Sequence, residues 1–398
     1  MTHEDASGVV IEPGSYSTRI GVAGDVAPLC VVSSSVLKSG DTSQFHIPVS
    51  GSPPPDAEVW TPVVDGVLED VELAAMQWEH FVSKQIGVEL REQPLTITEE
   101  PWNTNHSRSK LLQHVFEGLE VPIFQLAKSP LVAAFECSKP TAFVVIVGGS
   151  IASSIPFVDG VIRSKALPRT PFAGDFVDIP ILNQFAHAKD NIVPQYQVDA
   201  RLHGLETLPA AQEAMKLKAR GSDSFHNFQL SRLLDNIKRV CSVVNPVPLK
   251  GPEIKGTKSY QLPTGYSLLL GPERYLSAEP LFQPTNFSLG TQTPGPNSLG
   301  LSEIVYQSLQ KVDAPPEVVN SLASNIVLHG GTSLIPGLVK RLESDLLSMS
   351  PIVPKVYHST KHPVWTGASV FASLSEFHES NWITKQQFEE QGERLLKE

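Results

Sequence analysis

Residues 141–149 read Thr-Ala-Phe-Val-Val-Ile-Val-Gly-Gly. The run from Ala142 to Val147 is apolar, rich in β-branched residues and without polar alternation, which is typical of a strand buried on both faces. The two glycines favour a tight turn, and the residues from Ile155 to Arg163 are predicted to return as the hairpin partner. Helical segments follow later in the chain, so the pattern predicts an α/β protein.

A similar strand, glycine turn and strand occur near the start of the chain. Val9-Val10-Ile11 is a β-branched run, Pro13-Gly14-Ser15 supplies a turn, and the residues from Tyr16 to Val22 alternate apolar and polar. Helices are predicted after both copies. Duplicated halves of this kind can enclose a cleft, and the backbone amides of the two turns can hold phosphates there.

Composition excludes several classes of protein. The chain has 398 residues, 41% of them hydrophobic, which is enough for a large globular core, and its net charge is −11. The acidic balance argues against direct binding of nucleic acid. The longest apolar run is far shorter than the ~20 residues of a membrane span. The start of the chain does not resemble a secretory signal, and three isolated cysteines favour a reducing compartment, the cytosol or nucleus.

Three glycine turns are candidate phosphate or nucleotide contacts. Gly14, Ser15 and Arg19 could cradle a phosphate, although a plain hairpin has the same pattern. The turn at Gly148-Gly149 lacks a carboxylate until Asp159, which argues against hydrolysis there. Gly330-Gly331-Thr332 allows close approach of a ring or phosphate, and it equally fits a strand-to-helix turn.

Two further segments lead to separate predictions, one about metal binding and one about secondary structure. His358 and His362 have a spacing seen in metal sites, but Pro354 and Pro363 bracket them, and we expect no metal. The residues from Lys38 to Asp56 are polar and contain three consecutive prolines. We expect them to form a loop.

Taken together, short blocks along the whole chain resemble the actin family. They fall in the family's order and spacing at Val10–Ser15, Gly21–Pro28, Leu95–Asn103, Pro171–Phe176, Leu262–Gly265, Gly271–Arg274 with Leu281–Pro284, Gly330–Gly337, and Trp365–Ser369 with Trp382–Gln386. The resemblance implies an actin/hexokinase-type two-lobed fold with a central cleft, each lobe having a mixed sheet flanked by helices. It implies a small lobe of residues 1–139 and 355–398, with a shortened outer subdomain at about 35–61. Residues 140–354 would form the large lobe, with an outer subdomain at about 175–260.

Within the family, the chain is similar to the divergent nuclear actin-related proteins. The blocks Trp102–Thr104, Ala173–Phe176 and Gly271–Arg274 resemble the fourth actin-related protein, found in remodelling and acetyltransferase complexes. The blocks Leu29–Val32, Ala75–Trp78 and Val121–Gln125 resemble the seventh, a fungal subunit of the SWI/SNF and RSC remodellers. We favour the seventh-like role.

The resemblance also indicates what has been lost. The family's phosphate-loop aspartate falls at Glu12, its second-loop aspartates at Ile146 and Gly149, and its water-positioning glutamine at Ser129. Phosphoryl transfer needs a positioned water and ordered magnesium, so we expect no enzyme activity. A vestigial site that allows ATP binding without hydrolysis would comprise Gly14, Ser15, Arg19, Gly148, Gly149, Lys238, Gly330, Gly331 and Thr332. Alternatively, the cleft is empty and held shut by side chains.

The expected function is therefore structural. The family's groove for a partner helix falls at Phe135, Phe371 and Leu374, although these large apolar residues could equally be core. The expected partners are the helix preceding the motor of a SWI/SNF-type remodelling ATPase, and actin or a second actin-related protein, in the nucleus. Nucleic acid would be contacted only indirectly. The alternatives are a fourth-like subunit of a histone-exchange or acetyltransferase complex, a weak ATPase and a cytoskeletal protein. The proline-rich segment from Ser35 to Thr61 argues against filaments.

Overall fold

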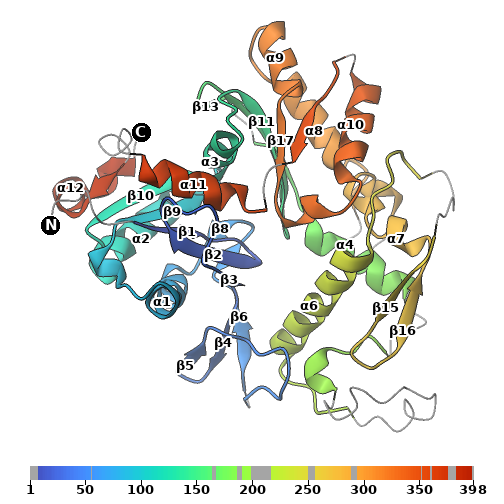
Figure 1. Cartoon of the computed structure of the whole chain (residues 1–398), viewed down its shortest axis with the longest axis horizontal. Coiled ribbons are helices and arrows are strands. Elements are labelled where there is room, and N and C mark those ends of the chain that lie inside the picture. Colours follow the sequence, from blue (N-terminus) through green and yellow to red (C-terminus); the bar gives the residue numbers. More distant parts are fainter. Residues whose placement is uncertain are drawn as a thin grey trace.

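The structure is a computed structural model that describes most of the chain. The described residues are 8–54, 56–163, 167–185, 191–198, 217–249, 256–287, 294–350, 352–358, 361–374 and 382–396. They form two lobes, each with a mixed sheet flanked by helices (Figure 1).

The first lobe is built on a six-stranded sheet in the order β19-β10-β9-β1-β2-β3. Its strands are β1 (Val9–Glu12), β2 (Ser17–Val22), β3 (Cys30–Ser33), β9 (Leu95–Glu99), β10 (Ile123–Lys128) and β19 (Ile383–Thr384). β9 runs parallel to both β1 and β10, and the other pairs are antiparallel. The helices are α1 (Val71–Phe81), α2 (Asn105–Gln113), α3 (Ser129–Glu136), α11 (Pro363–Ser373) and α12 (Lys385–Gln391).

Helix starts in this lobe follow the capping residues of the sequence. The side chain of Asp70 accepts a hydrogen bond from the backbone N–H of Leu73 and so begins α1. Thr104 begins α2 in the same way, by accepting from the N–H of Ser107. Such caps satisfy N–H groups that have no partner within the helix.

The second lobe is built on the sheet β13-β12-β11-β17-β18, with β14 also paired to β12. Its strands are β11 (Ala142–Val147), β12 (Ala152–Val158), β13 (Val161–Ile162), β14 (Arg169–Thr170), β17 (Ile326–His329) and β18 (Val356–His358). The helices are α4 (Gly174–Gln184), α6 (Asp223–Cys241), α7 (Glu273–Leu276), α8 (Leu301–Gln310), α9 (Pro316–Ala323) and α10 (Leu338–Met349). A separate hairpin is formed by β15 (Lys258–Gln261) and β16 (Ser267–Leu270).

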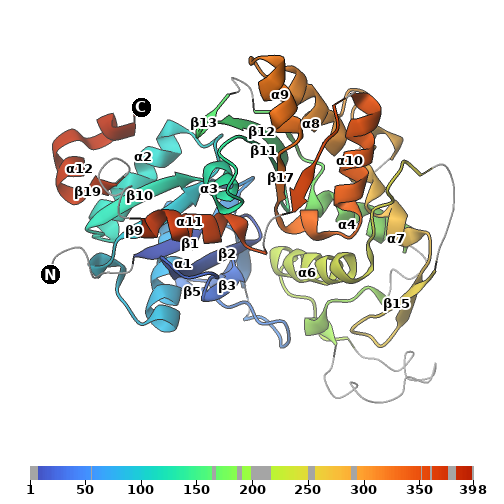
Figure 2. The same cartoon turned by 45° about the horizontal axis from the view of Figure 1, so that its top comes forward.

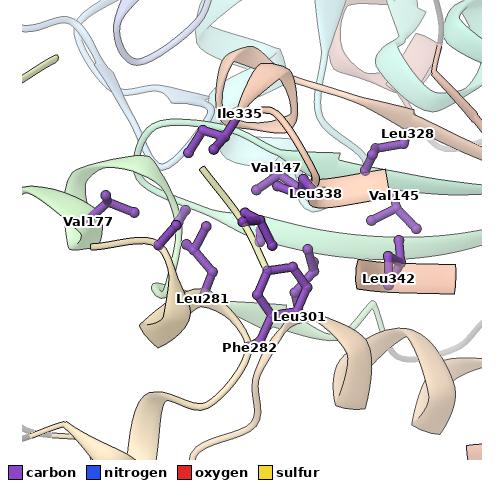
Figure 3. Close-up of a cluster of buried hydrophobic side chains, with 14 of the residues drawn as sticks. Val145, Val147, Val177, Leu281, Phe282, Leu301, Leu328, Ile335, Leu338 and Leu342 are labelled. Atoms are coloured by element: carbon purple, nitrogen blue, oxygen red, sulfur yellow. The ribbon is translucent and has the colours of Figure 1, made fainter. Parts of the chain in front are cut away.

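The predicted central strand is confirmed and lies in the largest core of the molecule. All six residues of β11 are buried. Figure 3 shows part of this core, in which Val145 and Val147 of β11 gather with Leu301 of α8 and with Leu338 and Leu342 of α10. Burial on both faces explains why the strand has no polar alternation.

Helices α3 and α11 pack against each other where the chain passes between the lobes, as Figures 1 and 2 both show. Gly367 of α11 lies so close to α3 that a Cβ atom there would be 2.0 Å from the carbonyl oxygen of Val132. Trp365 is fully buried, and its Nε1 donates to the carbonyl oxygen of Val10 at 3.0 Å. Helix α11, near the end of the chain, is thereby attached to β1, the first strand.

The prediction of a loop from Lys38 to Asp56 is wrong for part of that range. β4 (Val36–Ser39), β5 (Thr42–Gln44) and β6 (Glu58–Trp60) form a three-stranded antiparallel sheet in the order β5-β4-β6. Gly40 and Asp41 join β4 to β5 as a two-residue turn, a signal that the analysis of this polar stretch missed. Another short hairpin, β7 (Val63–Val64) with β8 (Val67–Leu68), follows.

The fold class predicted from the sequence is confirmed as α/β with two lobes, each a mixed sheet flanked by helices. The predicted lobe boundary at 139–140 and those of the outer subdomains stay predictions. The sheet of the second lobe includes β18 (Val356–His358), which lies past the predicted boundary at 354–355. Within the described ranges, the helices are all too short or too polar to traverse a lipid bilayer.

Candidate functional site

A cavity of about 280 Å³ lies between the first hairpin of the first lobe and helix α6 of the second. It is lined by Ser15, Tyr16, Ser35, Val59, Thr61, Gly149, Asp175, Ser224, Phe228, Ser231 and Arg232. Of the nine residues predicted for a nucleotide site, only Ser15 and Gly149 belong to this lining. The other predicted residues are engaged elsewhere, and their contacts explain why.

The first turn is tightly built. A Cβ atom on Gly14 would lie 2.9 Å from the carbonyl oxygen of Ser17, so the turn needs glycine. The hydroxyl of Ser34 donates to the carbonyl oxygen of Gly14 at 2.5 Å. Ser15 accepts from the N–H of Gly66 at 3.0 Å and from the hydroxyl of Ser150 at 3.3 Å. The last bond joins the two glycine turns across the lobes.

Arg19 is not among the residues that line the cavity, and it is neutralised within the protein. Its Nη1 pairs with Oε1 of Glu12, and its Nε donates to Nδ1 of His362 at 3.0 Å. Burial raises the pKa of Glu12, and the charge of Arg19 opposes that effect. The guanidinium of Arg19 therefore stabilises the charged form of the buried Glu12.

The second turn is held by other loops of the same lobe. The carbonyl oxygen of Gly148 accepts from Oγ1 of Thr332 at 2.7 Å, and that of Gly149 accepts from the N–H of Asp175 at 2.8 Å. A Cβ atom on Gly149 would lie 3.4 Å from Oδ1 of Asp175. The fold thus brings to this turn a carboxylate that spacing along the chain did not reveal. Burial raises the pKa of Asp175, and the charge of Lys238 opposes it.

The third turn also has a structural role. Gly330 has φ of +103°, and a Cβ atom there would lie 2.3 Å from the carbonyl oxygen of Val147. The hydroxyl of Thr332 donates to the carbonyl oxygen of Gly148, as described above. Gly331 is the exception, since a Cβ atom there would have open space around it. Two of the three residues are therefore explained by contact with the end of β11.

Lys238 is the most completely engaged of the predicted residues. Its buried ammonium donates to the carbonyl oxygen of Gly174 at 2.8 Å and to Oδ1 of Asp178 at 3.0 Å, and it lies 3.6 Å from Oδ1 of Asp235. The first two contacts are hydrogen bonds, and the third is an ion pair that is too long for a hydrogen bond. Burial raises the pKa of Asp178 to about 6, and the charge of Lys238 opposes that effect.

Tyr16, which the sequence analysis did not select, crosses the cleft. Its hydroxyl donates to Oδ2 of Asp235 on α6 at 2.9 Å. The guanidinium of Arg232 lies 4.3 Å from the centre of its ring, and that of Arg239 lies 5.7 Å away. Burial raises the pKa of Tyr16 to about 12, so the hydroxyl keeps its proton at neutral pH. Only the fold reveals this partnership, because the tyrosine and aspartate are 219 residues apart.

The structure shows the contacts of two positions to which the resemblance assigns the family's catalytic residues. Ile146 is a buried strand residue, and the hydroxyl of Ser129 donates to the carbonyl oxygen of Glu99 at 3.1 Å. Burial raises the pKa of Glu100 to about 8, with further contributions from the charges of Glu12 and Glu99. Glu100 is therefore largely protonated at neutral pH. No cluster of three metal-ligating side chains occurs in the described ranges.

Two of the three predicted groove residues come together. The rings of Phe135 on α3 and Phe371 on α11 meet edge to face at 6.1 Å. Phe135 is 36% exposed and Phe371 is 7% exposed, so the first presents an apolar surface and the second supports it. Leu374 directly follows α11 and is partly buried. The structure thus separates a surface residue from a core residue where the sequence left both readings open.

Comparisons with known proteins agree with this fold. The sequence pattern of the actin family matches residues 3–398. The chain is 31% identical to "Actin-related protein 4" of Yarrowia lipolytica, over 99% of this chain and 96% of the relative. It is also 31% identical to "SWI/SNF and RSC complexes subunit arp42" of Schizosaccharomyces pombe, over 98% and 97%. "Actin-related protein 4" of Arabidopsis thaliana is 30% identical over 84% and 78%. With its two-lobed structure and these relatives, the chain belongs to the actin family.

Proposed function

We propose that this chain is a non-catalytic structural subunit of an ATP-dependent chromatin-remodelling complex of the SWI/SNF or RSC type, working in the nucleus. The relative from Schizosaccharomyces pombe, which matches nearly the full length of both chains, supports this by its name. The seventh-like character favoured by the sequence points to the same class of complex.

The observation that carries the proposal is the engagement of Lys238. The buried ammonium of Lys238 donates two hydrogen bonds within its own lobe and forms an ion pair with Asp235, so its charge is balanced by the protein itself. The same logic applies to Arg19 and Thr332, which are paired internally. A chain that has the family's fold but pairs these cleft side chains with its own residues is expected to act as a scaffold and not as an enzyme.

Catalysis is further opposed by what the cleft lacks. Ile146, Gly149 and Ser129 cannot order magnesium or an attacking water, both of which phosphoryl transfer requires. Asp175 lies beside Gly149, and the positive charge of Lys238 acts on its carboxylate. ATP binding without hydrolysis would have to use the small cavity beside Tyr16, and the subunit does not require it for its role.

The partner surface of the proposal is the groove marked by Phe135, Phe371 and Leu374. An exposed aromatic ring backed by a buried one suits an apolar anchor of a docking helix. The occupant would be the helical segment that precedes the motor of the remodelling ATPase, shared with actin or a second actin-related protein. With a net charge of −11, the subunit would reach nucleic acid only through its neighbours.

Affinity purification of the tagged protein from its own cells tests the proposal. We expect a SWI/SNF-type ATPase and a second actin-fold protein in fixed proportion. The variant Phe135→Asp should lose both, whereas Leu269→Asp, at a 68% exposed residue of the β15–β16 hairpin, should keep them. Recovery of the chain alone, or with filament proteins, would refute the assignment.

A second candidate is a fourth-like subunit of a histone-exchange or acetyltransferase complex. It is favoured by the relatives named "Actin-related protein 4" in Yarrowia lipolytica and Arabidopsis thaliana. Acetyltransferase subunits in the same purification would select this candidate.

A further inference from the structure

The two lobes also touch beside the cavity, whose lining shares Val59 and Ser224 with this contact. On the first lobe this contact is made by the sheet β5-β4-β6 and the segment between its strands. On the second lobe it is made by the start of α6 and by the short 3-10 helix η5 (Gln195–Gln197). We propose that this contact is an interlobe clamp, which holds the lobes closed without any ligand. The proposal goes beyond the assignment to a remodelling complex and does not depend on it.

The apolar half of the clamp is a small core of its own. Leu37, Ile47 and Ala57 of the first lobe pack with Tyr196 and Phe225 of the second, and all five are buried. The rings of Tyr196 and Phe225 meet edge to face at 5.0 Å. Separating the lobes would expose these side chains to water, and the hydrophobic effect opposes that.

The polar half ties α6 to the backbone of the first lobe. Ser222, the N-cap of α6, donates to the carbonyl oxygen of Ala57 at 2.5 Å. Ser224 accepts from the N–H of Val59 at 2.9 Å and also donates to the carboxylate of Glu58. These bonds give partners to backbone groups beside and within β6 that sheet pairing leaves free, and unpaired groups there would be costly.

A third contact extends the clamp further along the helix. Gln229 of α6 is buried, and its Nε2 donates to the carbonyl oxygen of Pro48 at 2.7 Å. Beyond it, the same helix carries Asp235, which accepts from Tyr16. α6 is therefore attached to the first lobe at both its start and its second half. A ligand in the cleft would add to a closure that already exists.

The charge of Glu58 provides a direct test. Ser224→Glu would place a second carboxylate against Glu58, and the two would repel. Glutamate in the first turn of α6 favours the helix itself, so the variant acts on the contact and not on helix formation. Asn227→Glu adds the same charge to an exposed position of α6 and is the matched control. Adding Glu58→Lys to Ser224→Glu replaces repulsion by attraction and should restore the clamp.

The measurement is hydrogen–deuterium exchange of the purified full chain, read for residues 57–61 and 222–229. In the unmodified protein these amides should exchange slowly, and 1 mM MgATP should change their rates less than twofold. Ser224→Glu should raise the rates at least tenfold, Asn227→Glu should leave them unchanged, and the double variant should restore them. Amides of β11 report whether any variant has simply unfolded, and Ser224→Ala then serves as the milder substitution.

Two results would overturn the clamp. The first is fast exchange at residues 57–61 in the unmodified protein that slows tenfold when MgATP is added, because closure would then depend on the nucleotide. The second is a Ser224→Glu rate equal to that of the Asn227→Glu control. Neither result bears on which complex contains the subunit, since the exchange is measured on the isolated chain.

Discussion

The hydroxyl of Tyr16, in the first hairpin, donates a hydrogen bond of 2.9 Å to Oδ2 of Asp235 on α6. This bond joins the two lobes. Asp235 also pairs with Lys238 and Arg239 on its own helix. One carboxylate therefore connects the first turn of the chain to the lysine that resemblance had assigned to a nucleotide. The groups that would meet a ligand in this cleft bind one another.

Removing the hydroxyl tests the bond across the lobes. Tyr16→Phe keeps the ring under Arg232 but loses the bond to Asp235, so we expect a loss of about 1–2 kcal/mol in the free energy of unfolding. Urea denaturation measures it. Tyr266→Phe is the control, because that hydroxyl has no hydrogen-bond partner among the described residues, and it should change stability by less than about 0.5 kcal/mol. Equal effects of the two variants would contradict the role of Tyr16.

Lys238 is expected to be structural. Lys238→Met leaves the buried Asp178 without its cation and leaves Asp235 paired with Arg239 alone, so unfolding without nucleotide should become easier by about 3–5 kcal/mol at pH 8. The loss should shrink at pH 5, because Asp178, with a pKa of about 6, is then largely protonated and no longer needs the charge. Lys311→Met, at an exposed position, is the control. A lysine kept for a ligand would instead give little loss in the absence of nucleotide.

Glu100 should make the protein less stable as the pH rises, whereas a carboxylate paired with a cation makes a protein more stable as the pH rises. The Glu100 pKa of about 8 lies above the ordinary value of 4.5, so the folded state loses stability as the pH rises between these values and the buried group must ionise. Glu100→Gln removes this effect. The variant should match the unmodified protein at pH 5 and be more stable by about 1–3 kcal/mol at pH 9.

Chemical denaturation at the two pH values decides the matter. Glu89→Gln, in a 59% exposed side chain, should show no such pH-dependent difference. A Glu100→Gln variant that loses stability relative to the unmodified protein as the pH rises would mean that the carboxylate is paired and needed in its charged form.

The sequence allowed those parts of the fold to be predicted that depend on local pattern. The buried strand β11 and the hairpin at Gly14 follow from a continuous apolar run and from turn residues. The sheet β5-β4-β6 was missed because its strands are short and polar. They gain their stability from Phe225 and Tyr196, which are distant in the chain.

The candidate site was less predictable, because it too depends on contacts between residues that are distant in the chain. The local pattern identified Gly14, Gly148 and Gly330 as turn residues, and the close backbone contacts explain why glycine is required at Gly14 and Gly330. The resemblance assigned the same glycines to a vestigial ATP site. It could not reveal that Asp175 lies beside Gly149, or that Tyr16 meets Asp235. Such pairs are created by the tertiary fold, and no local spacing encodes them.

The most direct test of the account is a single-turnover ATP hydrolysis assay on the purified full chain with magnesium. We expect no phosphate release above the background without protein, because the family's catalytic positions fall at Ile146, Gly149 and Ser129 and because Lys238 and Arg19 are paired internally. Magnesium-dependent release that Glu12→Gln abolishes would contradict it, since Glu12 would then be acting in a working phosphoryl-transfer site.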